Sequence, residues 1–142
     1  MSHVAEARWG GECARTLHSA DEAEQLVNDL ARFYNDDGTR GLVITLGPVD
    51  AGDQLEVAVN IDDGRTSLRW LESPAAVAIQ EGLPAHPWPV RVFATDIEGY
   101  RLLPPDQTRV TPGRALEAVR EYLDTGTRPT CLTWNSQETA GR

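Results

Sequence analysis

The fold is decided by one stretch of the sequence, Gln54-Leu55-Glu56-Val57-Ala58-Val59-Asn60-Ile61, which is followed by Asp62-Asp63-Gly64 and then by Thr66-Ser67-Leu68-Arg69-Trp70-Leu71. The first eight residues alternate between polar and apolar, which is typical of a strand with one face toward water. The Asp-Gly pair that follows is a strong hairpin signal. The stretch therefore predicts an antiparallel hairpin over residues 54–71.

Further strand signals lie on both sides of this hairpin. Upstream, Gly10-Gly11 separates two short strand-like runs and predicts a hairpin between Val4 and Leu17. The remaining β-rich runs predict strands over residues 41–47, 90–95, 100–103 and 130–134. Prolines interrupt residues 73–89, where we expect only a helical turn over Ala75–Gln80.

Two helices are marked by their caps. Ser19 is an N-cap candidate with Glu22 three residues later, which is the spacing of a capping box. Thr111 and Pro112 open the second helix, and Gly126 is placed to close it. The apolar face of the first helix is predicted to consist of Ala23, Leu26, Val27, Leu30, Ala31 and Tyr34, with Asn35-Asp36-Asp37-Gly38 ending the helix.

These elements predict an α+β fold. We expect an antiparallel or mixed sheet of about five to seven strands, with two main helices packed on one face. The 142 residues suit a single domain over 1–142, in which the tail 135–142 is expected to fray.

Composition excludes several classes of partner. The formal net charge is −9 and the sequence pI is near 4.7, so nucleic acid and anionic membranes would be repelled, whereas a basic protein would be attracted. No apolar run approaches the ~20 residues of a membrane span. The N-terminus has neither a basic start nor an apolar core, so we expect a protein that stays in the cytoplasm.

The sequence contains no catalytic template. It has neither a glycine-rich phosphate loop nor a G-x-S-x-G elbow, and it lacks Cys/His clusters with zinc spacing. Cys13 and Cys131 are predicted to be small buried thiols, and His86 to lie in an exposed proline-rich loop. The paired aspartates precede glycines, as turns require. We therefore predict no catalytic residue, no cofactor and no metal.

The closing segment carries a family resemblance. Residues 112–134, PGRALEAVREYLDTGTRPTCLTW, are similar to the end of an actinobacterial immunity-protein family, which has a helix A-x-x-A-x-x-E-[FY]-L, then x-T-G-x-R-P-T, a short strand and a tryptophan. Leu55–Val59 and Ser67–Trp70 are similar to the central strands of the same family. The sequence departs from the family pattern at Val59–Asp63 and over residues 92–104, where partner contacts would be expected to vary.

The resemblance implies a protein without chemistry of its own. Members of that family are encoded beside polymorphic toxins, often with nucleic-acid deaminase domains, and they protect the producing cell by binding the toxin. The resemblance thus implies an immunity protein that neutralises a cognate toxin by covering its basic active-site region.

The residues themselves suggest where such a partner would bind. An enzyme that acts on nucleic acid carries a basic groove, which carboxylates can occupy in place of phosphates. We expect Asp62, Asp63 and Glu72, flanked by Trp70 and Trp88, to contribute to this acidic face. Trp9 and Trp134 are expected in the core.

Two other functions are compatible with the sequence. The first is a self-associating or regulatory module, whose partner would be a second copy in a homo-oligomer. The second is a small enzyme or ligand-binding domain that uses His86 and a pocket of carboxylates.

Overall fold

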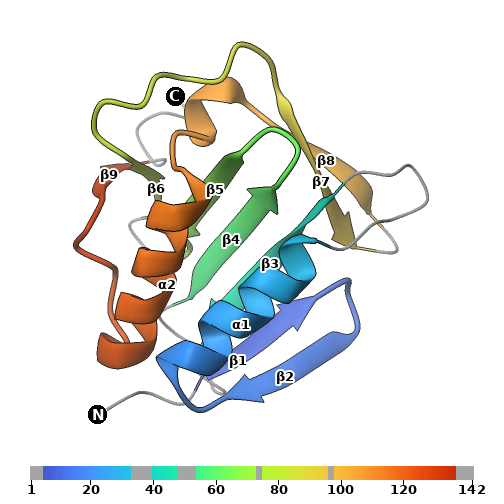
Figure 1. The fold of residues 1–142 in the computed structure, drawn as a ribbon, viewed down its shortest axis with the longest axis vertical. Coiled ribbons are helices and arrows are strands. Elements are labelled where there is room, and N and C mark those ends of the chain that lie inside the picture. Colours follow the sequence, from blue (N-terminus) through green and yellow to red (C-terminus); the bar gives the residue numbers. More distant parts are fainter. Residues whose placement is uncertain (1–4, 33–39, 48–53, 73–74, 96–97, 137–142) are drawn as a thin grey trace.

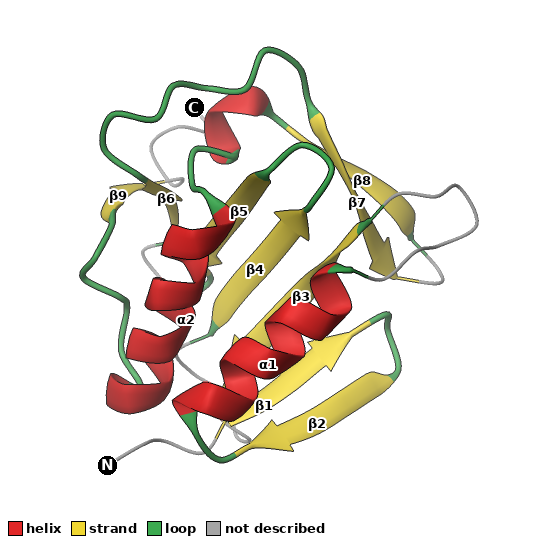
Figure 2. Ribbon diagram, viewed as in Figure 1, coloured by secondary structure: helices red, strands yellow, loops and turns green. Residues whose placement is uncertain are grey.

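The computed structural model describes residues 5–32, 40–47, 54–72, 75–95 and 98–136. Within these ranges the chain forms nine strands and two α-helices (Figure 1). Both helices lie side by side on one face of the sheet (Figure 2). The α+β class and the placement of the two helices are therefore confirmed.

The sheet is mixed and built mostly from antiparallel neighbours. Its main order is β2-β1-β3-β4-β5-β6-β9, and β7 joins β3 in parallel through Leu42 and Phe93 while pairing with β8. The strands are β1 (Ala5–Trp9), β2 (Cys13–Leu17), β3 (Gly41–Gly47), β4 (Leu55–Asn60), β5 (Arg65–Trp70), β6 (Ala76–Ile79), β7 (Val90–Thr95), β8 (Gly99–Leu103) and β9 (Thr133–Ser136).

The predicted hairpins are confirmed, but the number of strands was wrong. β4 pairs with β5 in antiparallel fashion across the predicted Asp-Gly turn, and Val57 lies opposite Leu68. The sheet has nine strands rather than five to seven. The helical turn predicted for Ala75–Gln80 is instead β6, because pairing with β5 and β9 outweighs the local preference of this short alanine-containing run. The closing strand, predicted over 130–134, is β9 at Thr133–Ser136, so residues 130–132 are not part of it and the first two residues of the predicted frayed tail are paired in the sheet. Residues 137–142 lie outside the described residues.

Both helix starts are confirmed at their caps. The Ser19 hydroxyl accepts a hydrogen bond from the Glu22 backbone N–H, and α1 runs over Ala20–Ala31. The Glu22 carboxylate in turn accepts the N–H of His18. α2 (Pro112–Thr125) begins after Thr111 and is capped at its end by Gly126. The φ of Gly126 is +72°, a left-handed conformation that glycine adopts at little energetic cost. Tyr34 and the predicted stop at Asn35–Gly38 lie outside the described residues.

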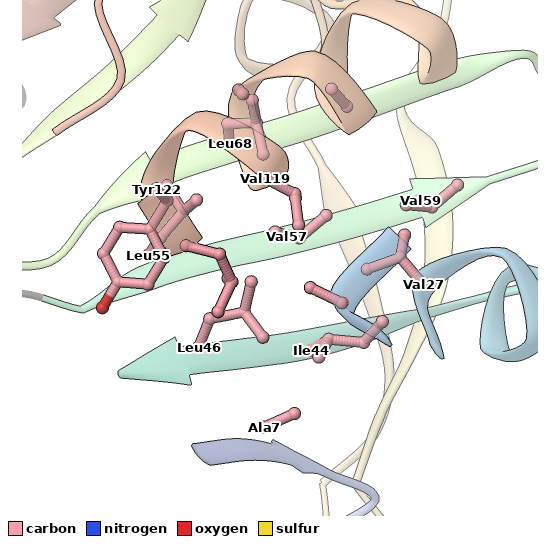
Figure 3. Close-up of a cluster of buried hydrophobic side chains, with 14 of the residues drawn as sticks. Ala7, Val27, Ile44, Leu46, Leu55, Val57, Val59, Leu68, Val119 and Tyr122 are labelled. Carbon is pink, nitrogen blue, oxygen red and sulfur yellow. The ribbon is translucent and has the colours of Figure 1, made fainter. Parts of the chain in front are cut away.

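The main core lies between the helices and the sheet (Figure 3). It is made of aliphatic side chains from the inner face of the sheet and from the facing stripe of each helix. Its fully buried large members are Leu17, Ile44, Leu46, Leu55, Val57, Leu68, Val110, Val119 and Leu123.

A second core covers the opposite face of the sheet. The hairpin β7–β8 lies over β3 and β4 and buries Val43, Ala58, Val90, Val92, Ala94 and Leu103. The prediction that β4 has one wet face was therefore wrong. Polar residues of β4 alternate toward this second layer, and Glu56 and Asn60 are buried there rather than solvated.

The cysteines and two tryptophans differ from the predicted burial. Cys13 is exposed, because it lies on the edge strand β2, where four of five residues face solvent. Cys131 is partly buried, and burial raises the pKa of its thiol, with Glu121 and Glu117 adding to the rise. Trp9 and Trp134 are partly buried and pack against the main core.

Within the described residues, no helix is long and apolar enough to cross a membrane.

Close packing of β3 on β4 makes Gly41 a test of the sheet. A Cβ at Gly41 would collide with the backbone of Val59 and Asn60. We predict that Gly41→Ala lowers the free energy of unfolding by about 3 kcal/mol, as overpacked sites do. Urea unfolding measures the loss. In Gly113→Ala the new methyl group meets nothing within 4 Å, so that variant should be neutral or slightly stabilised; equal stability of the two variants would contradict the packing.

Candidate partner-binding surface

The structure does not bring the five predicted interface residues together. Asp62 and Asp63 lie in the turn between β4 and β5, whereas Glu72 follows the far end of β5. A six-residue strand separates these ends by about 17 Å. The carboxylates therefore do not form the single acidic face that was predicted.

Asp62 is held by an ion pair within the chain. Its carboxylate accepts hydrogen bonds from Arg40 Nε at 2.9 Å and Nη2 at 2.6 Å. The hydrogen bond from the Arg40 side chain keeps the pKa of Asp62 below its ordinary value. Its charge is thus largely compensated before any partner arrives.

Trp70 belongs to the core rather than the surface. Its side chain is only 7% exposed and meets the ring of Tyr122 edge-on, with centroids 6.0 Å apart. Trp70 lies opposite Leu55, on the sheet face that packs against α2. The sequence could not reveal this burial, because the covering residue comes from more than 50 positions later.

Trp88 is exposed as predicted, with 57% of its surface accessible. His86, which was predicted to be exposed, is instead buried under this loop at 9% exposure. The His86 ring meets the Trp88 indole edge-on at 4.7 Å, and its Nδ1 lies 2.9 Å from the Trp88 carbonyl oxygen. His86 thus acts as a support for the loop.

The loop that carries Trp88 is fastened to its neighbours by arginines. Arg65 Nη1 donates to the carbonyls of Pro84 and Thr108, and Arg109 Nε donates to the carbonyl of Leu83. We call this part of the molecule the loop end: it comprises the β4–β5 turn (61–64), the loop 80–89 and the 3-10 turn Pro105–Gln107 (Figure 1). Of the five predicted residues, Asp62, Asp63 and Trp88 lie there.

Sequence reasoning missed Leu102 and Asp106, which lie near and just after the end of β8. Leu102, near the end of β8, is 66% exposed, and Asp106 lies in the 3-10 turn just after that strand. Leu102 pairs with the exposed Arg91, which places both on the outer side of the β7–β8 hairpin. The run Tyr100-Arg101-Leu102-Leu103 gives no clear alternation, so the sequence does not reveal which leucine points outward.

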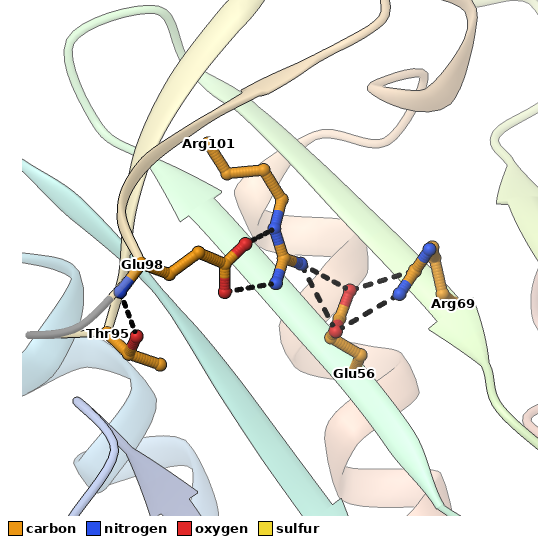
Figure 4. A network of polar contacts seen from close by, with 5 residues as sticks. All are labelled: Glu56, Arg69, Thr95, Glu98 and Arg101. Carbon is orange, nitrogen blue, oxygen red and sulfur yellow. Dashed lines mark hydrogen bonds and ion pairs between the residues drawn. The ribbon is translucent and has the colours of Figure 1, made fainter.

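A network of charges joins the β7–β8 hairpin to the sheet (Figure 4). The buried carboxylate of Glu56 accepts hydrogen bonds from Arg69 Nε at 2.8 Å and, at longer range, from Arg101 Nη1 at 3.4 Å. Arg101 also pairs with Glu98. Two acids face two arginines, so the network is neutral and its role is to fix β8 over β4.

An open cleft of about 180 Å³ lies beside this network, between the β1–β2 turn and the β7–β8 hairpin. Its charged lining residues are Arg8, Arg101 and Glu56. Arg8 is paired with Glu6 at 2.8 Å, and the other two are paired with each other. The cleft therefore offers a ligand no uncompensated charge.

The described residues offer little for catalysis or metal binding. They contain no group of three or more His, Cys, Asp or Glu side chains that could hold a metal ion. Among them, the only hydrogen-bonding contacts of the His86 ring are with the backbone of Trp88. Neither a nucleophile nor a carboxylate is therefore aligned with this histidine for acid–base work.

The excess negative charge is concentrated in the helix layer. The two helices carry seven acidic residues and two arginines, Arg114 and Arg120. Five of the nine excess negative charges of the chain therefore lie there. Arg120 joins the two helices by pairing with Asp21 and Glu24. The seven acidic residues of the helices are Asp21, Glu22, Glu24, Asp29, Glu117, Glu121 and Asp124.

One comparison with known proteins gives a match. The model of the family described as Immunity protein Imm1 matches residues 11–136. The match covers nearly the whole described chain, from the first turn to the last strand. No curated protein matches the chain.

The Glu56 network predicts how the second layer is held. Arg101→Met removes the link from β8 to the buried carboxylate, so we expect a loss of about 1–2 kcal/mol in stability and faster amide exchange in strands β7 and β8. Hydrogen exchange followed by mass spectrometry measures this. Glu98→Gln, which changes only the exposed arm of the network, should cost under about 1 kcal/mol; unchanged exchange in Arg101→Met would refute the role.

The Asp62 pair predicts a specific titration. In the folded protein Asp62 should titrate below the ordinary carboxyl range, and Arg40→Gln should raise its pKa toward that range. Because the folded pKa is depressed, the pair stabilises the fold above the unfolded pKa, and the contribution is lost as the pH falls through the folded pKa. Carboxyl-carbon NMR follows Asp62 directly, and identical titrations in both proteins would contradict the pairing.

Proposed function

Because the chain belongs to the Imm1 family of immunity proteins, we propose that it binds and neutralises a cognate toxin domain in the cytoplasm of the cell that produces both. The family match carries this proposal. We infer that neutralisation requires binding alone, without a cofactor, a metal or a reaction catalysed by this chain.

Charge supports a basic partner. The chain carries −9, and its helix layer holds most of that excess, so a basic toxin would be drawn to it by long-range attraction. Nucleic acid, which is itself anionic, would be repelled. A toxin that acts on nucleic acid has a basic groove for its substrate, so it would be a basic partner.

We further propose that the toxin acts on nucleic acid, for example as a deaminase, and that the chain blocks it by covering the basic active-site region. Such a groove already binds an anion, so an acidic protein competes with the substrate for the same cations. Asp62, Asp63 and Trp88, which share the loop end, are the predicted interface residues that remain grouped in the fold.

Co-expression tests the proposal. The family resemblance implies a toxin gene beside this one. The toxin domain of that gene, produced alone, should arrest growth, and growth should recover when this chain is produced with it. In vitro, the purified pair should form a complex whose association rate falls at least 10-fold between about 20 and 500 mM salt, because screening removes the electrostatic attraction. Stopped-flow binding measures the rate. A chain that neither rescues growth nor binds the toxin, or that only self-associates, refutes the proposal.

A further inference from the structure

Two large hydrophobic side chains are exposed among the described residues, and they lie at the same corner. These are Trp88 and Leu102. Val90 pairs with Leu103, so the start of β7 and the end of β8 lie side by side (Figure 1). Trp88 precedes Val90 by two residues, and Leu102 comes just before Leu103. Exposed apolar groups that gather in this way mark contact sites more often than isolated ones do.

Trp88 is held in place before any partner binds. Pro87 and Pro89 restrict the backbone on either side of it, and the buried His86 contacts its backbone through Nδ1 and its indole edge-on. Arg65 and Arg109 fasten the preceding part of the loop. Because little conformational freedom remains to be lost, an indole fixed in this way can bind at low entropic cost.

Two carboxylates border this apolar corner. Within the described residues, neither Asp63 nor Asp106 takes part in a salt bridge. Asp63 is tied to the corner through Asn60, whose side chain accepts the Asp63 N–H and donates to the carbonyl of Arg91. Asp106 follows Leu102 by four residues, in the 3-10 turn.

The arginines nearby are engaged elsewhere. Arg65 and Arg109 donate to loop carbonyls, and Arg40 pairs with Asp62. The guanidinium of Arg91 lies over the ring of Tyr100 at 3.9 Å. As far as the described residues go, the corner therefore combines a rigid aromatic side chain with carboxylates that form no salt bridge, and its complement is a cationic groove with a slot for a flat ring.

We propose that Trp88 and Leu102, with Asp63 and Asp106 beside them, form the surface that enters the substrate groove of the cognate toxin. The indole takes the slot that otherwise stacks a flat ring, and the carboxylates meet cations that otherwise hold phosphates. This inference rests on the proposed function. A second copy of this chain is a poor occupant, because a two-fold contact would oppose like carboxylates.

The test begins with the unmodified chain and the toxin domain used in the co-expression experiment. Binding of the two establishes the proposed function independently of the surface. Trp88→Ala should then weaken the complex about 30-fold or more, and Trp88→Phe, which retains a ring, should recover part of the loss. Asp63→Asn with Asp106→Asn should weaken it about 5- to 10-fold at low salt and much less at high salt.

A charge-matched control separates this corner from the rest of the acidic surface. Asp29→Asn with Glu72→Gln removes the same charge from α1 and from the far end of β5, and it should change affinity less than about 3-fold. Thermal unfolding of every variant confirms that each is folded. A short single-stranded thymidine oligonucleotide should compete with the unmodified chain for the toxin.

The outcomes distinguish the two proposals. If the unmodified chain does not bind the toxin, the proposed function fails. If the unmodified chain binds, and the folded Trp88→Ala and Asp63/Asp106 variants bind as tightly as it does, the proposed function stands and the proposed surface is wrong. A loss of affinity only in the Asp29/Glu72 control would place the contact away from the loop end, and absence of oligonucleotide competition would exclude the groove.

Discussion

The fold depends on the burial of one strand, β4, on both of its faces. Its inner face packs against the helices through Leu55, Val57 and Val59, and its outer face lies under the β7–β8 hairpin. Double burial leaves Glu56 inside the protein, where an unpaired carboxylate would cost several kcal/mol. Arg69 from β5 and Arg101 from β8 compensate this charge. Glu56, whose burial alone would destabilise the strand, therefore also fixes the hairpin above it.

This constraint determines what the surface can offer. With β8 held by Arg101 and Leu103, the next residues outward, Leu102 and the 3-10 turn, are presented in a fixed position. Asn60, at the end of β4, reaches across to the β7 backbone and ties the β4–β5 turn to the same corner. The loop end is thus tied to the sheet beneath it by side-chain hydrogen bonds, although it consists largely of turns.

Local signals in the sequence were sufficient for the parts of the fold that local chemistry determines. The Asp-Gly turn, the Ser19 and Thr111 caps and Gly126 specify their elements through contacts within a few residues. Strand β6, the burial of Trp70 and the pairing of Asp62 depend instead on partners far along the chain. An alternating pattern cannot show that a second layer will cover its polar side, so Glu56 read as solvated. Trp88 could be chosen from the sequence because it lies between two prolines. Leu102 could not, because the run around it does not show which leucine points outward.

Long-range attraction and close contact are assigned to different parts of the molecule. The helix layer holds most of the excess charge on exposed side chains, where it acts over a Debye length and increases the rate of encounter without fixing an orientation. The loop end carries fewer charges but places them beside apolar groups, which bind only at contact. The two regions are joined by Arg109 and Thr111, which connect the loop 80–89 to the start of α2. A substitution in the helix layer should therefore act mainly on the association rate, and one at the loop end mainly on the lifetime of the complex, because orientation is set where the apolar surface lies.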